Sequence, residues 1–379
     1  MKFRLSPPIL IAIALIAVIQ LVFFMVLKPM AGLAFQDQAP DWFARILDFL
    51  YPRFEVEKHR LGSEFFEAKA LQLNLRASLG VLAFFILFYW NKINLPRSAK
   101  WEGFWNKTTT LSHIQIIIIL FFLGVLFYTG TWYWDLKQYW MIKDFYRPVL
   151  IYQIFHVPLI SPGWALIFYL AMAFSCLAVI GNFRPFFFSI LALTIFLFLQ
   201  GFFYCFEKYD HRFVTLTYAF MLMPMVVKFG SRSDNTPQAW PVSLIQLMVG
   251  MVYLLAGLEK VFSSGLGWAS AKTFRAYIEL HQAPIGLKLA SSDFIMSVIP
   301  IMALIFQLCF WLIILFPRIK IPFLVAGILF HWGSVFLFNI GDLFTPWIFV
   351  YIFFLDFSLF KQFKERFKLL GVSVHQRII

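Results

Sequence analysis

The sequence predicts an all-α integral membrane protein, a polytopic bundle of about nine or ten transmembrane helices. Of its 379 residues, 61% are hydrophobic and 13% are charged, whereas soluble domains contain about 45–50% apolar and about 25% charged residues. Its apolar runs approach the roughly 20 residues that a spanning helix needs, about twice the length of a barrel strand. Because backbone groups in hydrocarbon must bond to one another, runs of this length predict helices.

Ten apolar runs, bounded by charged residues, Pro or Gly, give the predicted spans. These are Ile9–Leu27, Leu75–Trp90, Ile114–Thr131, Gly163–Ile180, Pro185–Phe206, Phe213–Val227, Val242–Val261, Phe294–Phe316, Ile321–Ile340 and Phe344–Phe360. The second and the sixth run are short, so the sequence also fits nine helices. The first run exceeds the apolar region of a typical signal peptide and no A-x-A pattern follows it, which favours a retained anchor.

Basic residues predict the orientation. The formal charge of +13 would suggest nucleic acid in a soluble protein, but in a membrane protein Lys and Arg mark the cytoplasmic loops. We therefore expect lipid and no nucleic acid as partner. The long loop over residues 28–76 is set aside, because long loops cross the membrane regardless of charge. The remaining basic residues then favour a cytoplasmic N-terminus and C-terminus in a cell (inner) membrane.

Three parts are expected along the chain. Residues 1–110 form an N-terminal transmembrane hairpin with an outer amphipathic loop, 111–360 a helical bundle, and 361–379 a basic cytoplasmic tail. Inside the outer loop, residues 41–50 carry apolar side chains at helical spacing among charged ones. This pattern predicts an amphipathic helix that either lies on the membrane surface or caps the bundle, and the spacing fits both.

Cysteine and metal-binding patterns are uninformative. The three cysteines, Cys176, Cys205 and Cys309, lie singly in apolar segments. No CxxC or HExxH spacing occurs, and an odd number of cysteines gives no disulfide framework. The sequence predicts no metal site.

One face of the predicted helix at residues 242–261 carries an unusual set of residues. Gln246, Gly250, Tyr253, Gly257 and Lys260 follow one another at spacings of three or four, which places all five on one side of a helix. Ionisable groups at membrane depth are costly and mark candidate sites. The face is therefore either a binding site, in which burial would favour a neutral Lys260 amine that can act as a base, or a packing seam of small residues.

Other polar groups allow two interpretations each. His211 belongs to a charged stretch, residues 207–212, that is either a solvated turn or part of a site shared with Lys260 at the outer helix ends. His331 and Gln307 lie within apolar runs. Each either hydrogen-bonds to a neighbouring helix or contacts a ligand.

Several segments resemble those of a known family, in the same order. They are Asp144–Pro148, Lys208–His211, Tyr253–Lys260 with Gly267 and Trp268, the stretch 269–282, Phe316–Arg318, and Gly327–His331 with the run to Asp356. Together they resemble the vitamin K-dependent γ-carboxylase family and its bacterial relatives with a horizontally transferred transmembrane (HTTM) domain. The likeness covers roughly residues 140–360.

The resemblance implies a chemistry. Lys260 matches the base that deprotonates reduced vitamin K (vitamin K hydroquinone, or menaquinol), and His211 matches an assisting residue. The quinol anion then reacts with O2 to give an epoxide and a strong base, which removes a proton from a glutamate γ-carbon before CO2 adds. Cofactor contacts are expected from Gln246, Tyr253, Gly257, His331 and Gln307. Two features depart from the family. The γ-carboxylases carry a large lumenal C-terminal region that engages the peptide, whereas this chain ends soon after its last predicted helix, which weakens a protein-glutamate substrate. Gln307 stands near a position where many relatives have an acid, which leaves the role of that acid open.

The leading hypothesis is an HTTM-type membrane enzyme, a lyase or oxygenase that uses a reduced quinone, O2 and CO2. The alternative is a non-catalytic lipid- or quinone-binding scaffold or a small-molecule carrier. A purely structural subunit is a third hypothesis, and it predicts a fully exposed Lys260. The sequence does not identify a protein partner.

Overall fold

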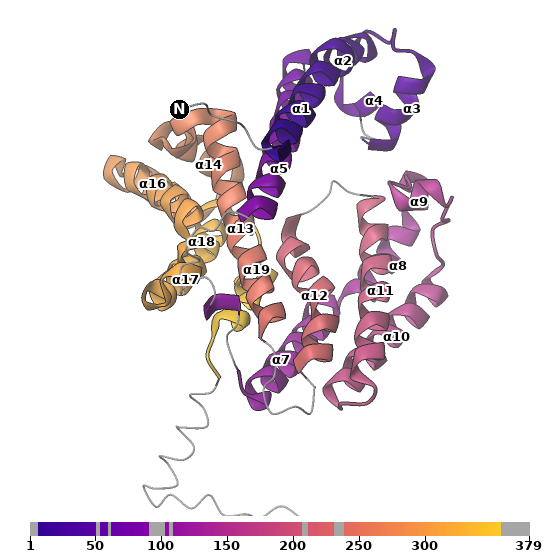
Figure 1. The fold of residues 1–379 in the computed structure, drawn as a ribbon, viewed down its shortest axis with the longest axis vertical. Coiled ribbons are helices and arrows are strands. Elements are labelled where there is room, and N and C mark those ends of the chain that lie inside the picture. The colour runs from indigo at the N-terminus through magenta and orange to yellow at the C-terminus, as the bar shows by residue number, and fades with distance from the viewer. Residues whose placement is uncertain are drawn as a thin grey trace, which may run out of the picture. The chain divides into compact units, whose positions relative to one another are not determined.

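The computed structural model describes most of the chain as helix (Figure 1). It covers residues 7–50, 54–59, 62–90, 103–105, 109–206, 211–230 and 239–357. These residues form helices, turns and loops and contain no strand. The contacts divide the chain into two compact units, residues 1–98 with 146–158, and residues 99–145 with 159–379. The predicted tail, residues 361–379, lies outside the described residues.

The first unit is built on a helical hairpin. Helix α1 (Pro7–Val22) continues through a π-helical turn (Phe23–Leu27) into α2 (Lys28–Phe35), and α5 (Ser63–Trp90) packs against it. The predicted loop over residues 28–76 is therefore wrong at both ends, because α2 and the first half of α5 are helical. In the π-helical turn the Lys28 N–H bonds to Phe23 O. This shift of the hydrogen-bond ladder lets the helix pass Pro29, which has no N–H to donate.

A polar cluster joins the two helices of this hairpin. The Gln20 Nε2 donates to Asn74 Oδ1 at 3.3 Å and to Ser78 Oγ at 2.8 Å, and Asn74 Nδ2 returns a bond to Gln20 Oε1 at 2.9 Å. Asn74 and Ser78 are buried. Because paired amides inside an apolar hairpin can satisfy one another in one register only, the cluster fixes how α1 and α5 align.

The amphipathic helix predicted over residues 41–50 is confirmed as α3 (Asp41–Leu50), followed by the short α4 (Phe54–Glu57). One apolar face of α3 packs inward, where Phe43 joins Phe54 in a buried cluster. Another face leaves Trp42 and Ile46 about half exposed, at 52% and 46%. The helix thus caps its own unit and still presents apolar side chains outward.

The second unit contains most of the other helices. They are α7 (Leu111–Thr129), α8 (Trp132–Met141), α10 (Pro162–Ile180), α11 (Pro185–Tyr204), α12 (Val214–Gly230), α13 (Trp240–Ser264), α14 (Ala271–His281), α15 (Pro284–Ala290), α16 (Asp293–Cys309), α17 (Leu312–Leu315), α18 (Lys320–Phe338) and α19 (Pro346–Phe349). The 3-10 helices η2 (Lys143–Phe145), η3 (His211–Phe213), η4 (Gly265–Ala269), η5 (Pro317–Ile319) and η6 (Val350–Phe354) lie between or after them. The first unit also contains α9 (Ile151–Ile154).

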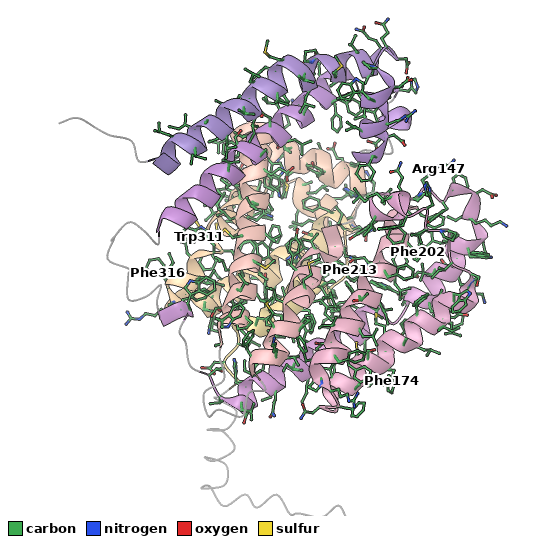
Figure 2. All side chains as sticks on the ribbon, turned by 45° about the vertical axis from the view of Figure 1, so that its right-hand side comes forward. Arg147, Phe174, Phe202, Phe213, Trp311 and Phe316 are labelled. Carbon is green, nitrogen blue, oxygen red and sulfur yellow. The ribbon has the colours of Figure 1, made fainter. Side chains whose placement is uncertain are left out.

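Aromatic side chains fill the core of the second unit and also cover its outside. Phe196 of α11 and Phe220 of α12 are fully buried with ring centroids 5.1 Å apart. Phe202 is likewise buried, whereas Phe174 of α10 is 59% exposed (Figure 2). Large apolar side chains on the outside are expected where a helix faces lipid rather than water.

Six helical segments of the described chain are long and apolar enough to cross a membrane, and a seventh results if the bent pair α15–α16 counts as one span. The six are Ile13–Phe35, Leu111–Met141, Pro162–Ile180, Pro185–Tyr204, Trp240–Ala269 and Pro317–Phe338. The predicted span Leu75–Trp90 falls on α5. The predicted span Phe213–Val227 falls on α12, an apolar helix of 17 residues. The all-α polytopic class is confirmed.

The tenth predicted span, Phe344–Phe360, is not a continuous helix in the part of it that the structure describes. The α-helical stretch has four residues and passes into η6, after which the chain leaves helical conformation at Leu355. The side chain of Gln246 on α13 donates to Phe353 O at 2.6 Å. This bond satisfies a carbonyl at the end of η6, where a longer helix would have supplied its own N–H donor.

Candidate functional site

The predicted face of α13 is largely buried against neighbouring helices. A Cβ added at Gly250 would lie 3.3 Å from Trp311, and one added at Gly257 would lie 3.1 Å from Leu308 Cγ and 3.2 Å from Gln307 Cβ. The two glycines therefore let α16 and the turn after it approach α13 closely. This is the packing seam of small residues that the spacing allowed.

Tyr253, between the two glycines, connects α13 to two other elements. Its hydroxyl lies 2.7 Å from Nε2 of His331 on α18 and 2.8 Å from the hydroxyl of Tyr351 in η6. Tyr253 and Tyr351 are buried, at 1% and 5% exposure, whereas His331 is partly exposed. The three side chains form a hydrogen-bonded series that begins near the surface of the unit and ends in its core.

Aromatic rings surround this series. The Tyr253 ring lies 5.2 Å from Phe306, 4.5 Å from Phe310 and 5.3 Å from Trp347, measured between centroids. The Trp347 ring also lies 5.7 Å from the His331 ring. Ring packing of this kind restricts both side chains to a narrow range of orientations.

Gly327 makes room for the end of the series. It lies one turn before His331 on α18, and a Cβ added there would lie 2.7 Å from Tyr351 Cζ and closer still to the hydroxyl oxygen. Only glycine lets the Tyr351 hydroxyl come this near to α18. The same hydroxyl can then reach Tyr253.

Gln307 has a buried side-chain oxygen that lacks a partner among the described residues. Its Oε1 has no hydrogen bond among the described residues, although the side chain is only 5% exposed. It adjoins Gly257 on α13, one turn before Lys260. Because buried polar atoms are nearly always paired, an unpaired one calls for a water or a ligand group.

Lys260 lies near the end of α13 and is partly buried. Its Nζ donates to the carbonyl of Ala256, one turn earlier, at 3.3 Å. It also lies over the ring of Trp268 in η4, 5.1 Å from the centroid. A fully exposed Lys260, which a purely structural subunit predicts, is not what the structure has.

Contacts from Trp268 place Lys260 at the same end of the unit as η3. Trp268 packs on Phe274 of α14 at 5.6 Å, and Phe274 packs on Phe338, at the end of α18, at 5.3 Å. Four residues beyond Phe338, Asp342 forms an ion pair with Arg212 of η3. The stretch 269–282 that the resemblance singled out thus contains α14, whose Phe274 contacts both Trp268 and Phe338 at this end.

His211 is the first residue of η3, which packs against α19. Its side chain, and residues 207–210 before it, lie outside the part of the chain described. The backbone of η3 lies at the same end of the unit as Lys260. A contact between the His211 and Lys260 side chains stays a prediction. Trp347 of α19 links this end to the Tyr253 ring.

The sequence-based prediction missed Tyr351, Trp347 and the role of Gly327. Tyr351 and Trp347 are four residues apart, a spacing that puts two aromatic rings on one face of a helical turn. Tyr351 and Tyr253, however, are separated by 98 positions. A single sequence contains no signal for such a contact.

The structure and the spans together define a multi-pass, all-helical membrane protein. In the described residues, no group of three or more His, Cys, Asp or Glu side chains is arranged to hold a metal ion. Comparison with protein-family models, with curated proteins and with solved structures finds no match to the chain. The resemblance to the γ-carboxylase family therefore stays a prediction from the motifs.

Proposed function

We propose that the second unit is a quinol-dependent membrane enzyme of the vitamin K-dependent γ-carboxylase (HTTM) type, with Lys260 as its base. Its substrates would be a reduced quinone such as menaquinol and O2, with CO2 where carboxylation is coupled to the oxidation. One observation supports this most. The partly buried Lys260 lies one turn along α13 from Gly257, against which Gln307 of α16 packs, and the buried Gln307 Oε1 has no hydrogen bond among the described residues.

The groups on this face fit a reduced quinone. Gln307 Oε1 is an acceptor, which suits a quinol hydroxyl as donor, and Lys260 would take up the proton of a second hydroxyl. The buried rings of Tyr253 and Phe306 lie next to this position and keep its surroundings apolar. A bound quinol would supply the electrons that reduce O2. The protein residues would orient the ring and hold its protons.

The test is O2-dependent oxidation of menaquinol by the full chain in lipid nanodiscs, followed by quinone absorbance. The native protein should exceed the rate of empty nanodiscs. Lys260→Ala should lower the rate by about 10²–10⁴-fold, the contribution of a general base. Lys272→Ala, which removes an exposed lysine of α14 at the same end, should leave the rate unchanged. Equal turnover in the native protein and Lys260→Ala would remove the base assignment.

A second candidate is a non-catalytic quinone- or lipid-binding scaffold. It is favoured by the two contacts of Lys260, because a carbonyl of Ala256 and the ring of Trp268 both stabilise the charged ammonium. On this alternative the native protein binds menaquinone and shows no turnover above the empty nanodiscs. The same assay, combined with a binding titration, separates the two functions.

A further inference from the structure

The series of Tyr253, His331 and Tyr351 has a direction that its hydrogen bonds can reveal. Tyr253 has two partners, His331 Nε2 and the Tyr351 hydroxyl. Within the described chain, His331 and Tyr351 have no hydrogen bond other than the one each makes to Tyr253. Among the described residues, the positions of its protons therefore depend on these three side chains.

Three arrangements of the protons are compatible with both bonds. In the first, His331 Nε2–H donates to Tyr253 and Tyr253 donates to Tyr351, so that the buried Tyr351 proton has no acceptor among the described groups. In the second, Tyr351 donates to Tyr253 and Tyr253 donates to Nε2, so that both hydroxyl protons are used and the donor left over is Nδ1–H of the partly exposed His331. In the third, both neighbours donate to Tyr253, and its own buried proton has no acceptor. A buried donor without an acceptor is costly, and of the three arrangements the second leaves no buried hydroxyl in that state.

We propose that Tyr253 is a positioning residue that, by donating its hydroxyl proton to Nε2, holds His331 in the neutral tautomer with its proton on Nδ1. Nε2 is then occupied as an acceptor, and Nδ1–H is the one donor that the ring can offer. His331 is partly exposed and packs on Trp347, which fixes the plane of the ring. The Nδ1–H is available to an acceptor oxygen of a ligand.

The ligand oxygen that suits this donor is a carbonyl, which accepts hydrogen bonds and cannot donate them. For the identity of the ligand, the inference rests on the proposed function, in which this oxygen is a ring carbonyl of the quinone. Gln307 Oε1 is an acceptor and His331 Nδ1–H a donor. The two groups together would distinguish a quinol hydroxyl from a quinone carbonyl.

The tautomer can be measured without any ligand. Histidine ¹⁵N and ¹³C chemical shifts distinguish Nδ1–H from Nε2–H, and His331→Gln assigns the resonance in the full chain reconstituted in lipid. We expect Nδ1–H in the native protein and a shift to Nε2–H in Tyr253→Phe, which removes the hydroxyl that donates to Nε2. Tyr351→Phe should keep Nδ1–H, because Nε2 is then the one described acceptor left to the buried Tyr253 hydroxyl.

A matched control is Tyr128→Phe, which removes a hydroxyl that donates to Thr345 O and takes no part in the series. It should leave the His331 tautomer as in the native protein. Native His331 with its proton on Nε2, or with protons on both nitrogens, would overturn the proposal. So would a native tautomer in Tyr253→Phe.

The ligand is tested by adding oxidised menaquinone with a short isoprenoid tail to the same samples. Binding should move the Nδ1 resonance of the native protein, and Tyr253→Phe should raise Kd roughly three- to tenfold, the effect of one weakened hydrogen bond. If the tautomer responds as expected but menaquinone leaves Nδ1 unchanged, the quinone assignment fails and the positioning role of Tyr253 stands. An unchanged Kd in Tyr253→Phe would overturn its role in binding.

Discussion

Replacing Gly327 with Ala tests the hydrogen-bonded series without removing any of its polar atoms. The added Cβ would lie 2.7 Å from Tyr351 Cζ and closer to the hydroxyl oxygen. The Tyr351 ring cannot simply turn aside, because it is buried and stacks on Phe310 with centroids 5.7 Å apart. It must move away from α18, and the 2.8 Å bond between its hydroxyl and that of Tyr253 is lost.

The expected effect on the free energy of unfolding is the sum of three contributions. Overpacking in a tight core costs about 1–3 kcal/mol, and the lost hydrogen bond costs about 1 kcal/mol. Alanine is favoured over glycine inside a helix by about 1 kcal/mol. Gly327→Ala should therefore destabilise the protein by about 1–3 kcal/mol.

Gly333→Ala is the matched control on the same helix. A Cβ added at Gly333 has nothing within 4 Å, so only the helix preference acts, and the protein should be unchanged or stabilised by up to about 1 kcal/mol. Both variants are compared by thermal unfolding in the same detergent. The reasoning is refuted if Gly327→Ala is as stable as Gly333→Ala.

Three further changes test other parts of the structure. Asn74→Leu leaves the amide of Gln20 without its reciprocal partner in the α1–α5 hairpin and should lower stability by about 0.6–2 kcal/mol, measured by unfolding in detergent. Arg275→Gln breaks the ion pair with Asp293, whose side chain is 92% exposed; we expect less than about 1 kcal/mol, and a larger loss in the same measurement would contradict this. Gln307→Leu removes the unpaired buried carboxamide and should raise stability by about 1–3 kcal/mol, while lowering menaquinol affinity in a binding titration if the proposed site is correct.

Composition and apolar runs were sufficient for the fold class and for several helix positions. The run Gly163–Ile180 became α10 (Pro162–Ile180), and Pro185–Phe206 became α11 (Pro185–Tyr204). These boundaries are predictable because a proline at the first turn of a helix needs no hydrogen-bond donor there. The first residues of such helices can therefore be predicted from the sequence.

Apolar runs failed where the chain continues a helix through polar residues or breaks one inside an apolar segment. Helix α2 begins at Lys28, where hydropathy predicts an end, and α5 begins twelve residues before Leu75. In residues 344–357 the chain is apolar throughout most of its length, yet it forms a short α-helix and a 3-10 helix. Hydropathy measures burial in lipid or protein and does not tell which helix type packing will select.

The candidate site was predictable on one helix and not beyond it. A spacing of three and four along α13 correctly placed Tyr253 and Gly257 on the buried face, because a single helix has a fixed period. The partners of Tyr253 come from α18 and η6, and no local pattern links them to α13. Tertiary contacts of this kind depend on how the helices pack, which the periodicity of one helix does not contain.

The packing seam and the site on α13 have the same physical origin. Because Gly257 has no side chain, Gln307 approaches α13 closely, and for the same reason α13 offers no side-chain donor to its carboxamide. A seam that served only stability would hold an apolar side chain at position 307, since an unpaired buried amide costs about 1–3 kcal/mol. That uncompensated cost is what argues for a hydrogen-bond donor from outside the described chain. If Gln307→Leu raises stability without any loss of quinol binding, this face of α13 serves helix packing only.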